Sequence, residues 1–120
     1  MATIITKIKL YLEANSKTYE SERPNIEVQD DMISGVSNPY IKTWSVSGLD
    51  KPTDSQLNSY ETAGNTRETN DTVLFKRKIE YLSWQEQLDK LYHDIDDDKL
   101  DKTGSWYTHI KAVKDANSKG

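Results

Sequence analysis

The stretch LYHDIDDDKLDKTGSW combines a run of aspartates with a histidine, the residue types that could hold a metal ion. Asp94, Asp96 and Asp98 stand at alternate positions, as the first three ligands of an EF-hand calcium loop do. Such a loop also requires glycine at position 6 and a bidentate glutamate at position 12. Counted from Asp94, these positions hold Lys99 and Ser105. The sequence therefore favours a solvated acidic loop, and a calcium-dependent binding module is only the third hypothesis.

The sequence also lacks the residue patterns that zinc binding, acyl transfer and phosphate binding require. His93 and His109 occur without cysteine and at no recognised metal-ligand spacing, so they predict surface or boundary positions rather than a zinc site. No G-x-S-x-G elbow and no cysteine is available for acyl transfer. The five glycines are scattered singly, which argues against a phosphate-binding loop. We expect no catalytic residue, no metal, no cofactor and no enzymatic activity.

Charge and hydropathy narrow the class of partner. Sixteen basic and twenty acidic residues give a net charge of −4, which argues against nucleic acid as a main ligand. The basic cluster at residues 76–78 is typical of a solvated helix face, because phosphate binding by counterion release needs more cations. No apolar run reaches the roughly 18 residues of a membrane span. The first residues lack the apolar region of a signal peptide, so we expect a soluble chain, cytosolic when made.

The low apolar content predicts a need for a partner. Only 34% of the 120 residues are hydrophobic and 30% are charged, against roughly 45–50% apolar in typical globular chains. The seven tyrosines and three tryptophans must then supply much of the core, although aromatic residues also favour interfaces. The residues predicted to form the core are Trp44, Trp84, Leu88, Leu91, Trp106, Ile110 and Val113. The candidates for an interface are Tyr40, Tyr60, Phe75, Arg77 and Tyr81.

The first fifty residues predict a small α/β region, one helix plus a β-hairpin. Residues 3–13 fit a strand or a helix, and we favour the helix because it explains the adjacent Ile4 and Ile5. Residues 26–28 and 40–46 alternate as strands do, with Tyr40, Trp44 and Val46 on one face. Because an isolated two-stranded hairpin is not stable, we expect the helix to cover its apolar face.

Residues 51–120 predict a helical region. Thr53 and Gln56 form a capping box at the start of a possible helix over residues 53–82. The centre of that helix is polar and contains Gly64, so it either bends or projects away from the core. Ser83 and Glu86 form a second capping box.

An αα-hairpin is expected to close the chain, with Ser105 capping the last helix and residues 94–104 as the acidic connector. Its two apolar stripes would then face each other. The first stripe consists of Trp84, Leu88, Leu91, Tyr92 and Ile95, and the second of Trp106, Ile110 and Val113. The expected fold class is therefore α+β: an N-terminal helix and β-hairpin, a long helix and a C-terminal helical hairpin.

Two segments resemble proteins of bacteriophage and prophage tail modules. QDD…SNPYIKTWSVSGLDKPTDSQL is similar to the middle of the XkdW-like proteins of PBSX-type elements. RKIEYLSWQEQLDKLYHDID…GSWYTHIKAVKDANSKG resembles a C-terminal segment common in tail-associated proteins. Together they cover about residues 28–119, and Leu82 and Ser118 stand where that segment usually has proline. The matching C-terminal residues are Arg77, Tyr81, Ser83, Gln87, Leu88, Asp89, Leu91, Tyr92, His93, Trp106, Ile110, Val113 and Lys114.

The resemblance implies a small, non-enzymatic tail protein with no catalytic residue or cofactor. We expect a virion component that attaches to or decorates the tail or tail fibres through protein–protein contacts, forming a homo-oligomer in the assembled particle. Its partners would be tail or tail-fibre proteins, and it would occupy the host cytoplasm during assembly and the virion afterwards. The alternative is a tail-fibre or tail assembly chaperone that is absent from the mature virion.

Overall fold

The computed structural model describes all 120 residues and has the expected α+β class. It divides into two compact units, Met1–Glu68 and Thr69–Gly120, and the boundary falls within a helix. The elements of the first unit are α1 (Ile4–Ala14), α2 (Tyr19–Glu22), β1 (Ile26–Gln29), β2 (Tyr40–Trp44) and α3 (Asp54–Asn58). Helix α4 (Glu61–Glu80) continues into the second unit, where α5 (Trp84–Asp96) and α6 (Ser105–Ala116) follow. None of the helices combines the length and apolar character that a bilayer crossing requires.

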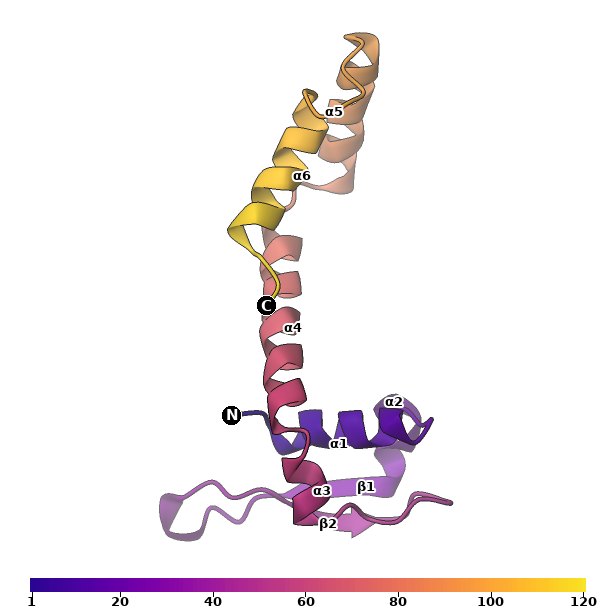
Figure 1. Cartoon of the computed structure of the whole chain (residues 1–120), viewed down its shortest axis with the longest axis vertical. Helices are drawn as coiled ribbons and strands as arrows, with labels where there is room; N and C mark the ends of the chain where they lie inside the picture. The colour runs from indigo at the N-terminus through magenta and orange to yellow at the C-terminus, as the bar shows by residue number, and fades with distance from the viewer. The chain divides into compact units, whose positions relative to one another are not determined.

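Helix α1 supplies the centre of the only sizeable core. The predicted helix is confirmed, and the Thr3 side chain caps it by accepting from the Thr6 amide. Ile8 and Leu12 are fully buried, and burying each side chain is worth about 1.5–3 kcal/mol. In Figure 1, α1 lies along the β-hairpin, as expected for the cover of its apolar face. The other buried members of this core are Ile41, Val46 and Leu57.

The β-hairpin is antiparallel but irregular, and this changes its predicted apolar face. Ile26 pairs with Trp44 and Val28 with Ile41, while a register shift between Glu27 and Val28 leaves an extra residue in β2. Such a bulge resets the alternation of side chains across the strand. Ile41 therefore joins Trp44 on the core side, three positions away. The prediction that Tyr40 shares this face is wrong, since Tyr40 is 41% exposed.

Two aromatic residues at the edge of this core, Tyr11 and Trp44, hydrogen-bond to backbone carbonyls of the segment that follows β2. The Tyr11 and Trp44 rings lie 6.0 Å apart in a tilted arrangement. The Tyr11 hydroxyl donates to the Asp50 carbonyl at 2.9 Å, and Trp44 Nε1 donates to the Leu49 carbonyl at 2.8 Å. Buried aromatic donors need such partners. These bonds hold the segment after β2 against α1, and Trp44 is half-buried at the edge of the core, as predicted.

Residues 51–68 belong to the first unit, so the boundary between the units lies after Glu68 rather than at residue 50 as predicted. Thr53 and Gln56 form the expected capping box, and Leu57 of α3 is buried in the α1 core. The helix predicted over residues 53–82 is not continuous: α3 ends at Asn58 and α4 begins at Glu61. The break therefore precedes the polar stretch that was expected to bend or project.

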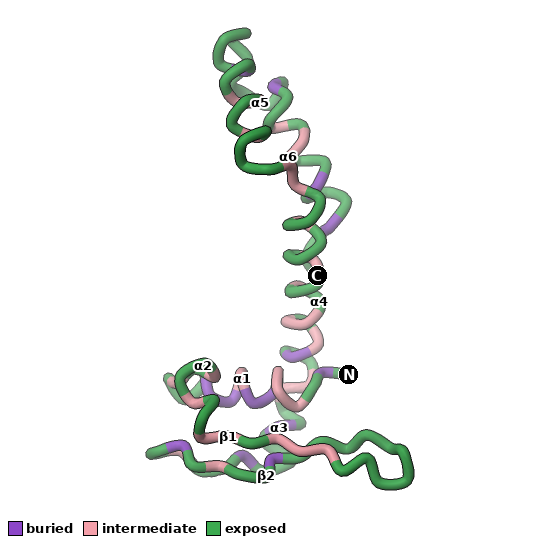
Figure 2. The backbone as a smooth tube through the Cα atoms, turned by 180° about the vertical axis from the view of Figure 1, so that it is seen from behind, coloured by how far each residue is buried: buried purple, intermediate pink, exposed green.

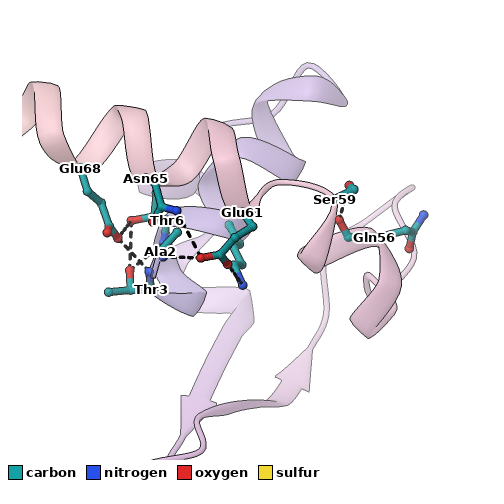
Figure 3. A network of polar contacts seen from close by, with 9 residues as sticks. Ala2, Thr3, Thr6, Gln56, Ser59, Glu61, Asn65 and Glu68 are labelled. Carbon is teal, nitrogen blue, oxygen red and sulfur yellow. Dashed lines mark hydrogen bonds and ion pairs between the residues drawn. The ribbon is translucent and has the colours of Figure 1, made fainter. Parts of the chain in front are cut away.

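The polar beginning of α4 is an interface with α1. Glu61 accepts from the Ala2 amide at 3.0 Å and pairs with Lys7 at 2.6 Å, while Glu68 accepts from the Thr3 amide at 2.8 Å. Figure 3 shows both carboxylates directed at the start of α1. The Lys7 bond holds the pKa of Glu61 below its usual value, and the Thr3 amide does the same for the pKa of Glu68. Hydrogen bonds thus replace apolar burial here, which explains how a polar helix packs.

Gly64 lies between these two carboxylates on the same face of α4. A Cβ at this position would stand 2.6 Å from the Ala2 Cβ, closer than side-chain carbons approach. Glycine normally weakens a helix interior by about 0.5–1 kcal/mol relative to alanine. At residue 64 the close contact with Ala2 outweighs that cost.

We expect Gly64→Ala to destabilise the first unit by about 1–3 kcal/mol because of overpacking, whereas glycine-to-alanine changes inside helices usually stabilise. Urea denaturation followed by circular dichroism measures the change. Ala2→Gly in the Gly64→Ala background removes the clashing carbon and should restore most of the loss. The exposed Thr66→Ala is the control on the same helix. A Gly64→Ala chain more stable than wild type would contradict the close packing.

Candidate interaction surface of the second unit

The second unit is organised by Asp94, the first aspartate of the acidic stretch. Its carboxylate accepts hydrogen bonds from the Ser105 amide at 3.0 Å, the Ser105 hydroxyl at 2.9 Å and the Trp106 amide at 2.8 Å. Asp94 is 94% shielded from solvent, with 6% of its surface exposed. The expected Ser105 cap is therefore wrong: Gly104 is the N-cap residue and makes no side-chain bond. Asp94, on the other side of the connector, accepts the amides at the start of α6 that have no partner within the helix. The side chain of the N-cap residue usually does this.

The pKa of Asp94 is lowered, chiefly by the Trp106 amide and also by the Ser105 amide and hydroxyl, while burial acts in the opposite direction. Gly104 makes this contact possible, since a Cβ there would stand 2.8 Å from Asp94 Oδ2 and collide with the Lys99 carbonyl. Asp101 is engaged in the same connector, accepting from the Thr103 amide at 2.7 Å. No three acidic or histidine side chains gather as metal ligands would.

The far end of α6 is fastened by Asn117. Arg77 Nε donates to the Asn117 carbonyl at 2.8 Å, and Asn117 Nδ2 donates to Glu80 Oε2 at 2.5 Å. His109 Nε2 accepts from the Leu82 amide at 3.2 Å, just beyond the end of α4. Hydrogen bonds therefore fix α6 at both ends. Arg77, an interface candidate, is half-buried and already uses one donor within the chain.

The predicted core of this unit is largely exposed. Trp84 is 68% exposed, Leu88 55% and Trp106 36%, so these three predictions are wrong. Leu91 and Ile110 are half-buried, and Val113 alone is a buried hydrophobic residue, 7% exposed. Figure 2 shows α5 mostly in the colour of exposed residues.

The cause of this exposure is the rotation of α5. Because Asp94 must reach the first turn of α6, the side of α5 that carries Asp94 faces α6. Neighbouring residues point about 100° apart around a helix of 3.6 residues per turn. The stripe that includes Ile95 is thereby turned away from α6. The exposed members of this stripe are Trp84, Leu88, Tyr92 and Ile95, and Leu91 is half-buried.

Three adjoining hollows lie beside α5, and the exposed Trp84 and Leu88 line two of them. The first is lined by Leu74, Tyr81 and Trp84 together with the cations Arg77, Lys78 and Lys114. The second shares Trp84 with the first and is lined mainly by Leu88, Leu91 and Trp106. The third shares Trp106 and lies in the acidic connector, among Asp94, Leu100 and Asp101 with Lys99 and Lys102. We call these three hollows together the α5 groove.

The two ends of the α5 groove carry opposite charge. Residues 94–102 hold five aspartates and two lysines, whereas residues 76–78 are all basic. The 13 residues of α5 separate these ends by about 20 Å at 1.5 Å per residue. This distance exceeds the Debye length of about 8 Å at physiological ionic strength. The two ends are therefore largely screened from each other, and each interacts separately with the charges of a bound partner.

The first unit exposes a separate apolar surface in the loop between its strands. Residues 31–40 are all exposed, including Met32, Ile33 and Val36. The loop is nevertheless ordered by Asp30, whose carboxylate accepts from the Ser37 hydroxyl at 2.6 Å and the Met32 amide at 3.0 Å. An ordered loop with exposed apolar side chains suits a protein contact.

The other interface candidates come from both units. Tyr40 lies at the base of this loop and donates to Asp31 at 3.0 Å. Tyr60 is half-buried between α3 and α4, and Phe75 is exposed on α4. Tyr81 lines the basic end of the α5 groove, edge-on to His109. Tyr81 shares this hollow with Arg77, and the part of all five candidates in an interface stays a prediction.

No protein-family model, curated protein or solved structure matches this chain.

We expect Asp94→Asn to lower the thermal midpoint of the second unit by on the order of 5 °C at pH 7, because a charged acceptor for two amides is lost. Hydrogen exchange of the Ser105 and Trp106 amides, measured by NMR, reports the same loss locally. The exposed Asp96→Asn is the matched control and should change neither quantity.

The difference between Asp94→Asn and wild type should also depend on pH. Since the folded pKa of Asp94 is lowered, the unfolded chain binds the proton more readily. The stabilisation is therefore present above about pH 4, the usual aspartate range, and is lost as the pH falls through the lower folded value. A difference that persists unchanged at about pH 2 would contradict this.

Proposed function

We propose that this chain is a non-enzymatic structural protein of a bacteriophage tail, a virion component that attaches to or decorates the tail or its fibres. The observation that carries the proposal is the exposure of apolar side chains in the second unit, where Val113 is the one buried hydrophobic residue. Soluble monomers rarely leave such a continuous apolar surface uncovered, and protein interfaces are where it is normally buried.

The resemblance to tail-module proteins supports the setting. Several of its matching residues lie in the α5 groove: Tyr81, Gln87, Leu88, Leu91, Trp106 and Lys114. A segment that served internal packing alone would be expected to bury most of its apolar side chains. The exposed Leu88 and Trp106 instead favour a motif that serves contact with another protein.

The chemistry within the chain is also consistent with a binding role. The carboxylates of Glu61, Glu68 and Asp94 accept backbone amides and hold helices together, and that of Asp30 orders the loop between the strands. These four carboxylates thus have structural roles.

We expect mass spectrometry of purified phage particles to detect the chain at a constant ratio to the other tail proteins. A phage encoding Leu88→Asp should yield particles that contain several-fold less of it, because a charge would be placed in the apolar centre of the groove. Thr66→Asp, at an exposed position of α4 in the first unit that belongs to neither candidate surface, controls for a general effect of the added charge. Absence of the wild-type chain from mature particles would overturn the proposal and favour the assembly chaperone.

A further inference from the structure

We propose that the α5 groove is occupied by a second copy of this chain, with the two second units packed antiparallel about a two-fold axis. This inference rests on the proposed role of the groove as a protein-binding surface and assigns its occupant. It follows from three features of the groove: its apolar spacing, its position on a helical hairpin and its two charged ends.

The apolar spacing along α5 suits a partner helix. Trp84, Leu88, Leu91 and Ile95 are separated by four, three and four residues, the pattern by which one helix packs along another. In the isolated chain α6 covers only one side of this stripe, leaving Leu91 half-buried and the others exposed. One more helix is needed to close the seam.

The helical hairpin of a second copy would provide that helix, and its own apolar stripe would be buried in the same contact. Two αα-hairpins packed through their apolar faces make a four-helix bundle, in which the stripe of each α5 lies in the shared core. A two-fold interface uses the same patch on both partners. The buried core that each second unit lacks would then form between the copies.

The charges select the antiparallel orientation. In that arrangement the acidic connector of one copy, residues 94–102, meets the basic end of the other, where Arg77, Lys78 and Lys114 line the groove. A parallel arrangement would bring the two acidic connectors together, which like-charge repulsion disfavours. The overall charge of −4 also opposes association unless positive and negative regions are matched in this way.

The position of the two-fold axis follows from placing the acidic connector of each copy against the basic end of the other copy's groove. It crosses the middle of α5, between Leu88 and Leu91, and places Trp84 of each copy near Ile95 of the other.

Sedimentation equilibrium of the full-length chain tests the self-association. We expect a reversible monomer–dimer equilibrium between about 1 and 100 µM, weakened as salt screens the charged ends. Leu88→Asp should raise the dissociation constant on the order of thirty-fold or more, as loss of a central apolar contact does, while Ile33→Asp should leave it unchanged. Circular dichroism verifies that each variant is folded.

Charge reversal provides a second test that does not alter the apolar centre. Lys78→Glu alone and Asp97→Lys alone should each weaken the dimer, and the double variant should recover most of the affinity because the two sites then attract again. A chain that is monomeric at about 100 µM would overturn the inference. Independent effects of the two reversals, with no recovery, would overturn the antiparallel pairing.

The orientation can be measured directly because the chain contains no cysteine. In an otherwise wild-type chain, Leu88→Cys lies beside the proposed axis and should form an intermolecular disulfide on mild oxidation. Lys102→Cys, in the acidic connector, lies far from its counterpart and should not. The reverse result would show a parallel dimer.

These outcomes separate this inference from the proposed function. A chain that stays monomeric in solution and is nevertheless present in purified particles would overturn the self-association and leave the tail role standing. A chain that dimerises through the groove and is absent from particles would overturn the tail role and leave the self-association standing.

Discussion

The bonds between Asp94 and the first turn of α6 determine how the second unit is built. Three donors, from Ser105 and Trp106, converge on one carboxylate, and Gly104 leaves the space for it to approach. Because the bond is directional, it fixes which side of α5 faces α6. The side that remains is the apolar one. An interaction that satisfies a helix end thus also creates the exposed groove.

The two units contain apolar residues in similar proportion but are stabilised by different means. The first unit concentrates aliphatic side chains in one core around Ile8 and Leu12, and the carboxylates of α4 attach to the start of α1. The second unit leaves most of its large apolar side chains exposed and relies on hydrogen bonds at both ends of α6, through Asp94 and Asn117. Because their acceptors are carboxylates, such bonds each contribute about 1.5–3 kcal/mol net, but they cover no apolar surface. A unit held in this way gains most from a partner that covers its apolar face.

This arrangement connects the acidic stretch to the proposed function. Its aspartates resemble a calcium loop in spacing, yet Asp94 is committed to α6 and Asp101 to its own turn. The exposed aspartates instead give one end of the α5 groove its negative charge. With the cations at the opposite end, the groove becomes complementary to itself when reversed. Charge placement of this kind contributes more to orientation and specificity than to affinity.

The sequence by itself determined the α+β class, the first helix, the two strands and both capping boxes, because these depend on local periodicity and on residues three or four positions apart. The tertiary structure decided the rest. The bulge in β2 that buries Ile41 instead of Tyr40, and the contact that requires Gly64, involve residues far apart in the chain. The same holds for the rotation of α5: apolar periodicity showed that Trp84 and Leu88 share a face, but only the distant bond from Asp94 to α6 decided that this face points outward.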